Sequence, residues 1–182
     1  ADLATGGHVT ANYREAYDLT VNINPSFGTE ALTGLNIFAG GHSKAQQRKT
    51  ANTVNDYYEG VAGVTFDIGP ISLGVARSGH VMGNTYQTAQ VSHYTGAMYG
   101  VSFNINDDLS VSYGKHKTRK AGYTSNTAAL GPNNLFVEVT SVQAAYTMGG
   151  ASVRVASSSA NNVGWSAGKD QDTTTVSLSL AF

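Results

Sequence analysis

The chain has no cysteine and only three prolines among its 182 residues. Without cysteine it can have neither a disulfide framework nor a thiolate metal site. It also has no apolar run near the ~18 residues that a membrane-spanning helix needs. These absences exclude a disulfide-stapled secreted domain and a helical membrane protein.

Charge is scarce as well, at 13% of residues, which is about half the usual share for soluble domains. The net charge is −1, so the chain offers no basic field to a nucleic acid. A mean hydropathy of −0.19 shows that polar and apolar residues are interleaved. With 21 glycines and 10 tyrosines, this composition predicts an all-β chain that forms a single domain over residues 1–182.

Period-two alternation marks about nine segments of the length typical of membrane-crossing β-strands. The last segment is the clearest: Val176, Leu178, Leu180 and Phe182 alternate with small polar residues up to the final residue. Its apolar face predicts a closing strand in a sheet whose outer surface does not contact water. The nine segments are residues 13–24, 32–42, 56–67, 71–79, 91–104, 109–117, 135–148, 151–158 and 172–182.

The connections between these segments alternate in length, which predicts the orientation of the sheet. Short turns rich in glycine, asparagine and aspartate fall at residues 69–70, 106–108 and 149–150, with a longer one at 25–28. Long polar loops fall at residues 43–55, 80–90, 118–134 and 159–171. Short turns on one side and long loops on the other are typical of an outer-membrane barrel.

Aromatic residues predict two interfacial belts at the ends of the strands, as in a membrane barrel. The short-turn side has Phe66, Phe103, Tyr146 and Phe182, and the long-loop side has Tyr17, Tyr57, Tyr58, Tyr94 and Phe136. Basic residues gather in the predicted long loops, namely Lys44, Arg48 and Lys49 in one, and Lys115, Lys117, Arg119 and Lys120 at another.

The succession of amphipathic hairpins, the turn at Gln143–Gly150 and the ending Val176–Phe182 resemble the C-terminal part of a general bacterial porin of the alphaproteobacterial type. The resemblance covers nearly the whole chain. It implies a 16-stranded, usually trimeric barrel in the outer membrane of a Gram-negative bacterium, in contact with lipid and lipopolysaccharide. It also implies passive diffusion of small hydrophilic solutes. In members of this family the constriction loop belongs to the N-terminal half of the barrel, which would place it outside this chain.

Nine strands cannot close an all-antiparallel barrel, because the first and last strands would then run in the same direction. One interpretation is a C-terminal portion of the larger barrel, with residues 1–12 the end of an external loop. Another is a complete small barrel, with ten strands if residues 8–13 form an extra one, or eight if two weak segments merge. The inward residues are mostly small, which favours a wide water-filled lumen over a packed interior.

Nothing in the sequence indicates catalysis or a cofactor. The five histidines lack metal-ligand spacing, and there is no G-x-S-x-G elbow. A diffusion pore needs instead a polar wall with a few fixed charges. The candidates by inward parity are Arg14, Asp18, Glu59, His116, Gln143 and Arg154. The rival hypothesis is a small eight- or ten-stranded barrel that acts as an adhesin or structural anchor through its long loops.

Overall fold

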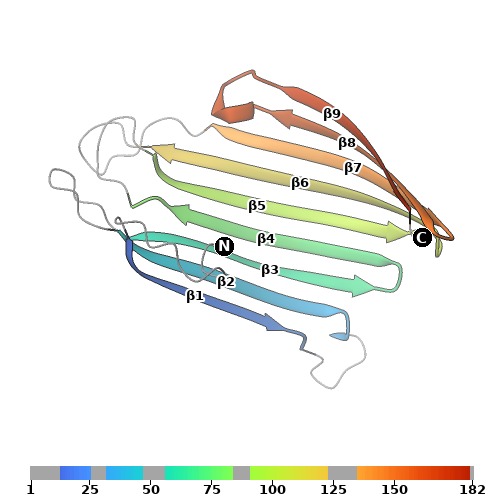
Figure 1. Ribbon diagram of the computed structural model, residues 1–182, viewed down its shortest axis with the longest axis horizontal. Helices are drawn as coiled ribbons and strands as arrows, with labels where there is room; N and C mark the ends of the chain where they lie inside the picture. Colours follow the sequence, from blue (N-terminus) through green and yellow to red (C-terminus); the bar gives the residue numbers. More distant parts are fainter. Residues whose placement is uncertain (1–12, 26–31, 47–55, 84–90, 123–134, 181–182) are drawn as a thin grey trace.

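The computed structural model describes residues 13–25, 32–46, 56–83, 91–122 and 135–180. These residues form one antiparallel sheet of nine strands in chain order (Figure 1). A short 3-10 turn, η3 (Val163–Trp165), lies between the last two strands. The strands are β1 (Tyr13–Ile23), β2 (Leu35–Gln46), β3 (Tyr57–Ile68), β4 (Ile71–Val81), β5 (Val91–Asn104), β6 (Leu109–Gly122), β7 (Phe136–Met148), β8 (Ala151–Asn161) and β9 (Gln171–Leu180).

The all-β prediction and the count of about nine antiparallel strands are confirmed. Each strand pairs with its neighbours in the sequence, so β1 and β9 are the two edges, and the sheet is open within the described residues. In Figure 1 the edge strands stand nearest the viewer and the middle strands are fainter, so the sheet is bowed like a trough. The proposed extra strand at residues 8–13 and the terminal Phe182 fall largely or wholly outside the described residues.

The alternation along the strands is inverted relative to a soluble domain. In β4 the apolar Leu73 and Val75 are 43% and 60% exposed, whereas Ser72 and Ser78 on the other face are half-buried. Side chains crowd on the inner side of a bowed sheet and spread on its outer side. The apolar face is therefore the convex one, and the polar face lines the trough.

This arrangement leaves the described residues without a hydrophobic core. Ala121 is the one hydrophobic residue that is buried there, while large apolar side chains stand exposed along every strand. Burying a valine or leucine side chain is worth about 1.5–3 kcal/mol, so ten such residues outweigh the ~5–15 kcal/mol net stability of a typical domain. The large apolar side chains of the convex face are left uncovered within the described residues.

The short turns have the chemistry that the sequence predicts. Gly69 and Gly149 adopt left-handed φ values of 56° and 57°, which glycine tolerates without steric cost. In the turn between β5 and β6, the Asn106 side-chain oxygen accepts hydrogen bonds from the backbone amides of Asp108 (3.0 Å) and Leu109 (2.8 Å). These local bonds set the register of the adjoining hairpins.

At the long-loop ends the strands extend further than predicted. β2 ends at residue 46 instead of 42, β6 at 122 instead of 117, and β8 at 161 instead of 158. Arg119 and Lys120, which fall in the loop predicted over residues 118–134, are therefore part of β6 together with Lys115 and Lys117. Pairing continues there because polar side chains bind across the strands: Lys115 contacts Glu138, and the Lys117 ammonium lies 3.7 Å from the same carboxylate.

Gly63 is a position where the sheet leaves no room for a side chain. A Cβ there would lie 2.5 Å from the ring of Phe38 and 2.8 Å from the carbonyl oxygen of Val75. We expect Gly63→Ala to destabilise the protein by about 1–3 kcal/mol through overpacking. Gly79→Ala is the matched control, because a Cβ at Gly79 meets no atom within 4 Å. Urea unfolding measures both variants, and equal midpoints would contradict this packing.

Candidate functional site

The concave face brings together the side chains predicted to line a pore. Asp18 lies opposite His42 on β2, and His42 lies opposite Glu59 on β3, so the three share one face. The pairing places three further candidates on this face, namely His116, Gln143 and Arg154. Arg14 belongs to β1, but its side chain lies outside the described part of the structure.

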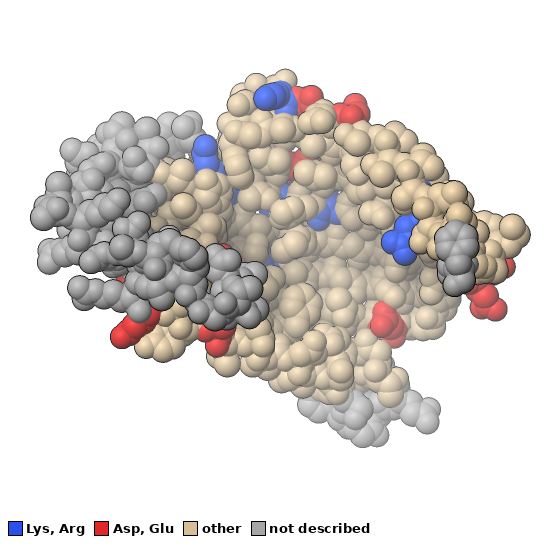
Figure 2. All heavy atoms as spheres, in the orientation of Figure 1, with Lys and Arg blue, Asp and Glu red and all other residues tan. Residues whose placement is uncertain are grey.

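Much of this concave wall carries little side-chain volume. Gly74 pairs with Gly100, and Gly100 pairs with Gly114, so three glycines cross β4, β5 and β6 side by side. The row continues through Ser141 and Ser158, whose hydroxyl groups share a 2.9 Å hydrogen bond. In Figure 2, which looks into the trough, the wall is mostly tan, with few charged groups on it.

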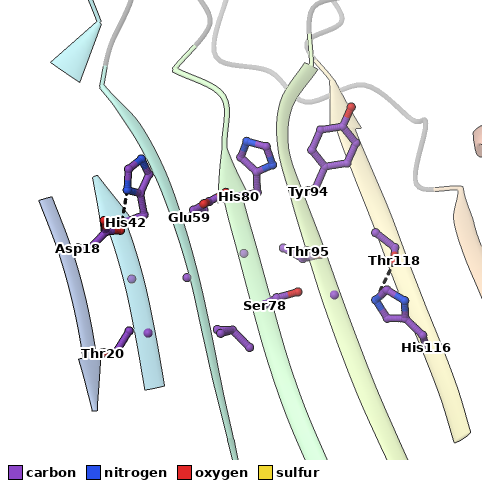
Figure 3. Close-up of a pocket in the computed structure, with 16 residues that line it drawn as sticks. Asp18, Thr20, His42, Glu59, Ser78, His80, Tyr94, Thr95, His116 and Thr118 are labelled. Atoms are coloured by element: carbon purple, nitrogen blue, oxygen red, sulfur yellow. Dashed lines mark hydrogen bonds and ion pairs between the residues drawn. The ribbon is translucent and has the colours of Figure 1, made fainter. Parts of the chain in front are cut away.

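A hollow of about 460 Å³ lies on this wall toward the long-loop ends of β1 to β6 (Figure 3). Asp18, Glu59 and His116 all line it, whereas Gln143 and Arg154 lie on the wall away from it. Nδ1 of His42 and Oδ1 of Asp18 share a 2.8 Å hydrogen bond. His116 Nε2 and the Thr118 hydroxyl share a 3.1 Å hydrogen bond. The lining therefore combines fixed carboxylates with imidazoles and hydroxyl groups.

A ring row borders the hollow, made of His42, Tyr57, His80, Tyr94 and Trp165. Successive ring centroids lie 6.0, 4.6, 5.6 and 5.2 Å apart, so the contact runs from β2 across to the connection after β8. The first two pairs are edge-on and the last two are tilted, both within the range of favourable aromatic contacts.

Two members of the ring row correct the predicted aromatic belt. Tyr57 pairs with Lys44 and Tyr94 pairs with His80, which places both tyrosines on the concave face. The sequence already indicates this for Tyr94. Tyr94 and the outward-facing Tyr99 are an odd number of positions apart in β5, so their side chains lie on opposite faces of the sheet. The remaining long-loop belt residues keep the convex phase, namely Tyr17, Tyr58 and Phe136.

Asn162 makes three of the hydrogen bonds that hold the connection carrying Trp165, beside backbone bonds from Val163 to Lys169 and from Lys169 to Ser166. The Asn162 side chain donates to the carbonyl of Phe136 (2.9 Å) and accepts from the amide of Gly168 (3.0 Å). Its backbone amide donates to the carboxylate of Asp170 (3.0 Å). Asn162 and Trp165 both have a φ of 56°, which is uncommon for residues with side chains. This connection reaches past β7 and β6 to set the indole beside Tyr94 of β5, and sequence periodicity gave no signal for it.

Trp165 is the single tryptophan of the chain, so its fluorescence reports on this loop. We expect Asn162→Ala to release the indole from Tyr94, since alanine loses both side-chain hydrogen bonds and tolerates the left-handed conformation less well. The emission maximum should shift to longer wavelength, and quenching by acrylamide should increase. Asn161→Ala is the control and should leave both unchanged; an unchanged spectrum in Asn162→Ala would show that Asn162 does not hold the loop.

Within the part of the chain that the structure describes, the residues that line the hollow include two carboxylates and no lysine or arginine. Lys120 lies at its border, with the ammonium nitrogen 5.4 Å from the centroid of the Trp165 ring. No group of three histidine, cysteine or acidic side chains in the described residues is arranged to hold a metal ion. The site is thus suited to holding a polar or cationic solute by charge and ring contacts.

In the part of the chain that the structure describes, no helix has the length and apolar character to span a membrane. Comparisons with protein-family models, with curated proteins and with solved structures find no match. Functional inference therefore rests on the residues and geometry described above.

Proposed function

We propose that the chain forms the wall of a water-filled porin channel in the outer membrane of a Gram-negative bacterium. The observation that carries this proposal is the inverted alternation: most large exposed apolar side chains lie on the convex face, with Arg77 as an exception, and the concave face is mostly polar or small, with Val61 as an exception. Lipid on the outside and water on the inside would satisfy both faces. Small hydrophilic solutes and ions would cross passively down their gradients, without catalysis.

The lengths of the strands and the long-loop rim of the convex face support a position in lipid. Its strands of 10–14 residues suffice to cross the hydrocarbon core when tilted. Toward the long loops it carries Lys115, Lys117 and Arg119, with the ammonium of Lys117 4.3 Å from the centroid of the Phe136 ring. Cations beside interfacial rings suit the phosphate groups of lipopolysaccharide, which we propose as the lipid partner on this rim.

The bare concave wall supports a wide lumen. A small eight-stranded barrel has to fill its interior with side chains. The row of Gly74, Gly100 and Gly114 has no side chains that could fill such an interior. β1 and β9 run in the same direction, so a closed antiparallel barrel needs an odd number of further strands. The bare wall favours the 16-stranded barrel that the porin resemblance implies over a small adhesin or anchor, and the trimer is proposed on that resemblance alone.

Liposome swelling tests the proposed diffusion directly. The assembled protein is reconstituted into vesicles, which are then diluted into isosmotic solutions of sugars of increasing size. We expect swelling rates that fall steeply with solute size and that do not saturate with concentration, as for a water-filled pore. A small closed barrel would leave the vesicles as tight as protein-free ones, and that outcome would overturn the proposal.

A further inference from the structure

The hollow beside the ring row has a charge pattern that selects one class of solute. Among the described residues, its lining includes Asp18 and Glu59 but no lysine or arginine. An anion placed there would face two carboxylates, and a neutral solute would leave both carboxylates without a counter-charge. A cation is the solute that these groups favour.

Both carboxylates are held in place through one oxygen each. His42 binds Oδ1 of Asp18 at 2.8 Å, and the Tyr57 hydroxyl donates to Oε2 of Glu59 at 2.8 Å. Within the described residues, the second oxygen of each carboxylate has no partner in the structure. The Asp18 side chain is 49% exposed. The carboxylates are therefore preorganised and accessible, which reduces the cost of binding a ligand.

The rings supply the second element of the site. Tyr94 lines the hollow, and its ring packs between His80 and Trp165 at centroid distances of 5.6 and 5.2 Å. Figure 3 shows His80 and Tyr94 on the same side of the wall as Asp18 and His42, above the hollow. The faces of such rings attract organic cations, and Lys120 already places its ammonium 5.4 Å from the Trp165 ring.

Forming the ring row also has a local cost in free energy. Nε2 of His80 and Nε1 of Trp165 are buried without a hydrogen-bond partner, and Trp165 has a left-handed backbone conformation. Unpaired buried polar atoms and strained backbone concentrate at binding sites, where the surrounding structure maintains them. Two independent observations, the carboxylates and the strained ring row, thus mark the same place on the wall.

We propose that this hollow is a binding site for small organic ammonium ions, primary or quaternary, with Asp18 and Glu59 as counter-charges and Tyr94 as the ring contact. The volume of about 460 Å³ suits a small solute with part of its water shell. The inference rests on the proposed channel, because it names the solute class that the channel holds at its long-loop mouth.

Tetramethylammonium chloride serves as the probe, added to the assembled protein in a planar bilayer at constant ionic strength. We expect a saturable decrease in single-channel current. The double variant Asp18→Asn/Glu59→Gln should raise the half-blocking concentration roughly tenfold or more, and Tyr94→Leu should raise it about two- to fivefold. Asp107→Asn, in the short turn far from the hollow, is the matched control and should leave it unchanged.

Two outcomes would overturn the site: an open channel that tetramethylammonium does not block, or a block that is the same in wild type and the double variant. A lack of any conductance would count against the proposed channel instead. Binding would then be measured in detergent through the fluorescence of Trp165, which borders the hollow, with sodium chloride as the ionic-strength control. A saturable change that the double variant abolishes would support the site, and no change would overturn it.

Discussion

An arginine at Val176 is expected to destabilise the assembled protein by about 2–4 kcal/mol. Val176 lies at the middle of β9 on the apolar face and is 68% exposed. In water, substitution of an exposed residue changes stability by about 0.5 kcal/mol or less. In a bilayer the same position would face the hydrocarbon midplane, where an arginine on a barrel strand costs about 2–4 kcal/mol. Urea titration of protein folded into phosphatidylcholine vesicles measures the difference.

Thr175→Arg is the matched control, one residue away on the same exposed strand. Thr175 faces the trough, where an arginine would remain in water. We expect its unfolding midpoint to stay close to that of wild type. Equal effects of the two arginines would contradict a lipid-facing convex side, because a soluble sheet makes no distinction between them.

A lysine at Glu59 is expected to reverse much of the cation preference of the channel mouth. Two unit charges change at a position that lines the hollow. Each unit is worth about 1 kcal/mol at 4 Å in water. The ratio of cation to anion permeability should therefore decrease roughly tenfold at low salt. The reversal potential across a potassium chloride gradient measures this ratio.

Two comparisons make the Glu59→Lys measurement specific. The effect should fade toward 1 M salt, where the Debye length is about 3 Å. The same charge change in Asp107→Lys, in the exposed turn between β5 and β6, should leave the ratio little changed. A reversal potential that does not move in Glu59→Lys would remove Glu59 from the conducting path.

Periodicity predicted the middle of the strands well because one physical cause acts there. Along a sheet with one apolar and one polar face, each strand alternates at every residue, as β4 does around Leu73 and Val75. The alternation stops where the apolar residues of the strand stop, so the sequence predicts that β6 ends at residue 117. Beyond that residue, β6 pairs with β7 as far as Arg119, next to the contacts of Lys115 and Lys117 with Glu138, and it pairs with β5 as far as Gly122.

The site was predictable only in part, for reasons that differ between residues. Parity alone placed Asp18, Glu59 and His116 on one face, and the register joined them in one hollow. The sequence prediction placed Tyr94 in the interfacial belt because it is a tyrosine near a strand end, although its position in the alternation of the strand places it on the concave face. The position of Trp165 depends on the hydrogen bonds of Asn162 to segments 6 and 26 residues away. Such long-range contacts leave no periodic signal in the sequence.

Single-channel recording in a planar bilayer tests the central claim most directly. The claim is that the apolar convex face and the bare polar wall enclose a water-filled path across a membrane. The assembled protein should produce discrete, ohmic conductance steps that rise roughly in proportion to bulk salt conductivity. A correctly assembled protein that inserts into the bilayer and yet passes no current would contradict the account.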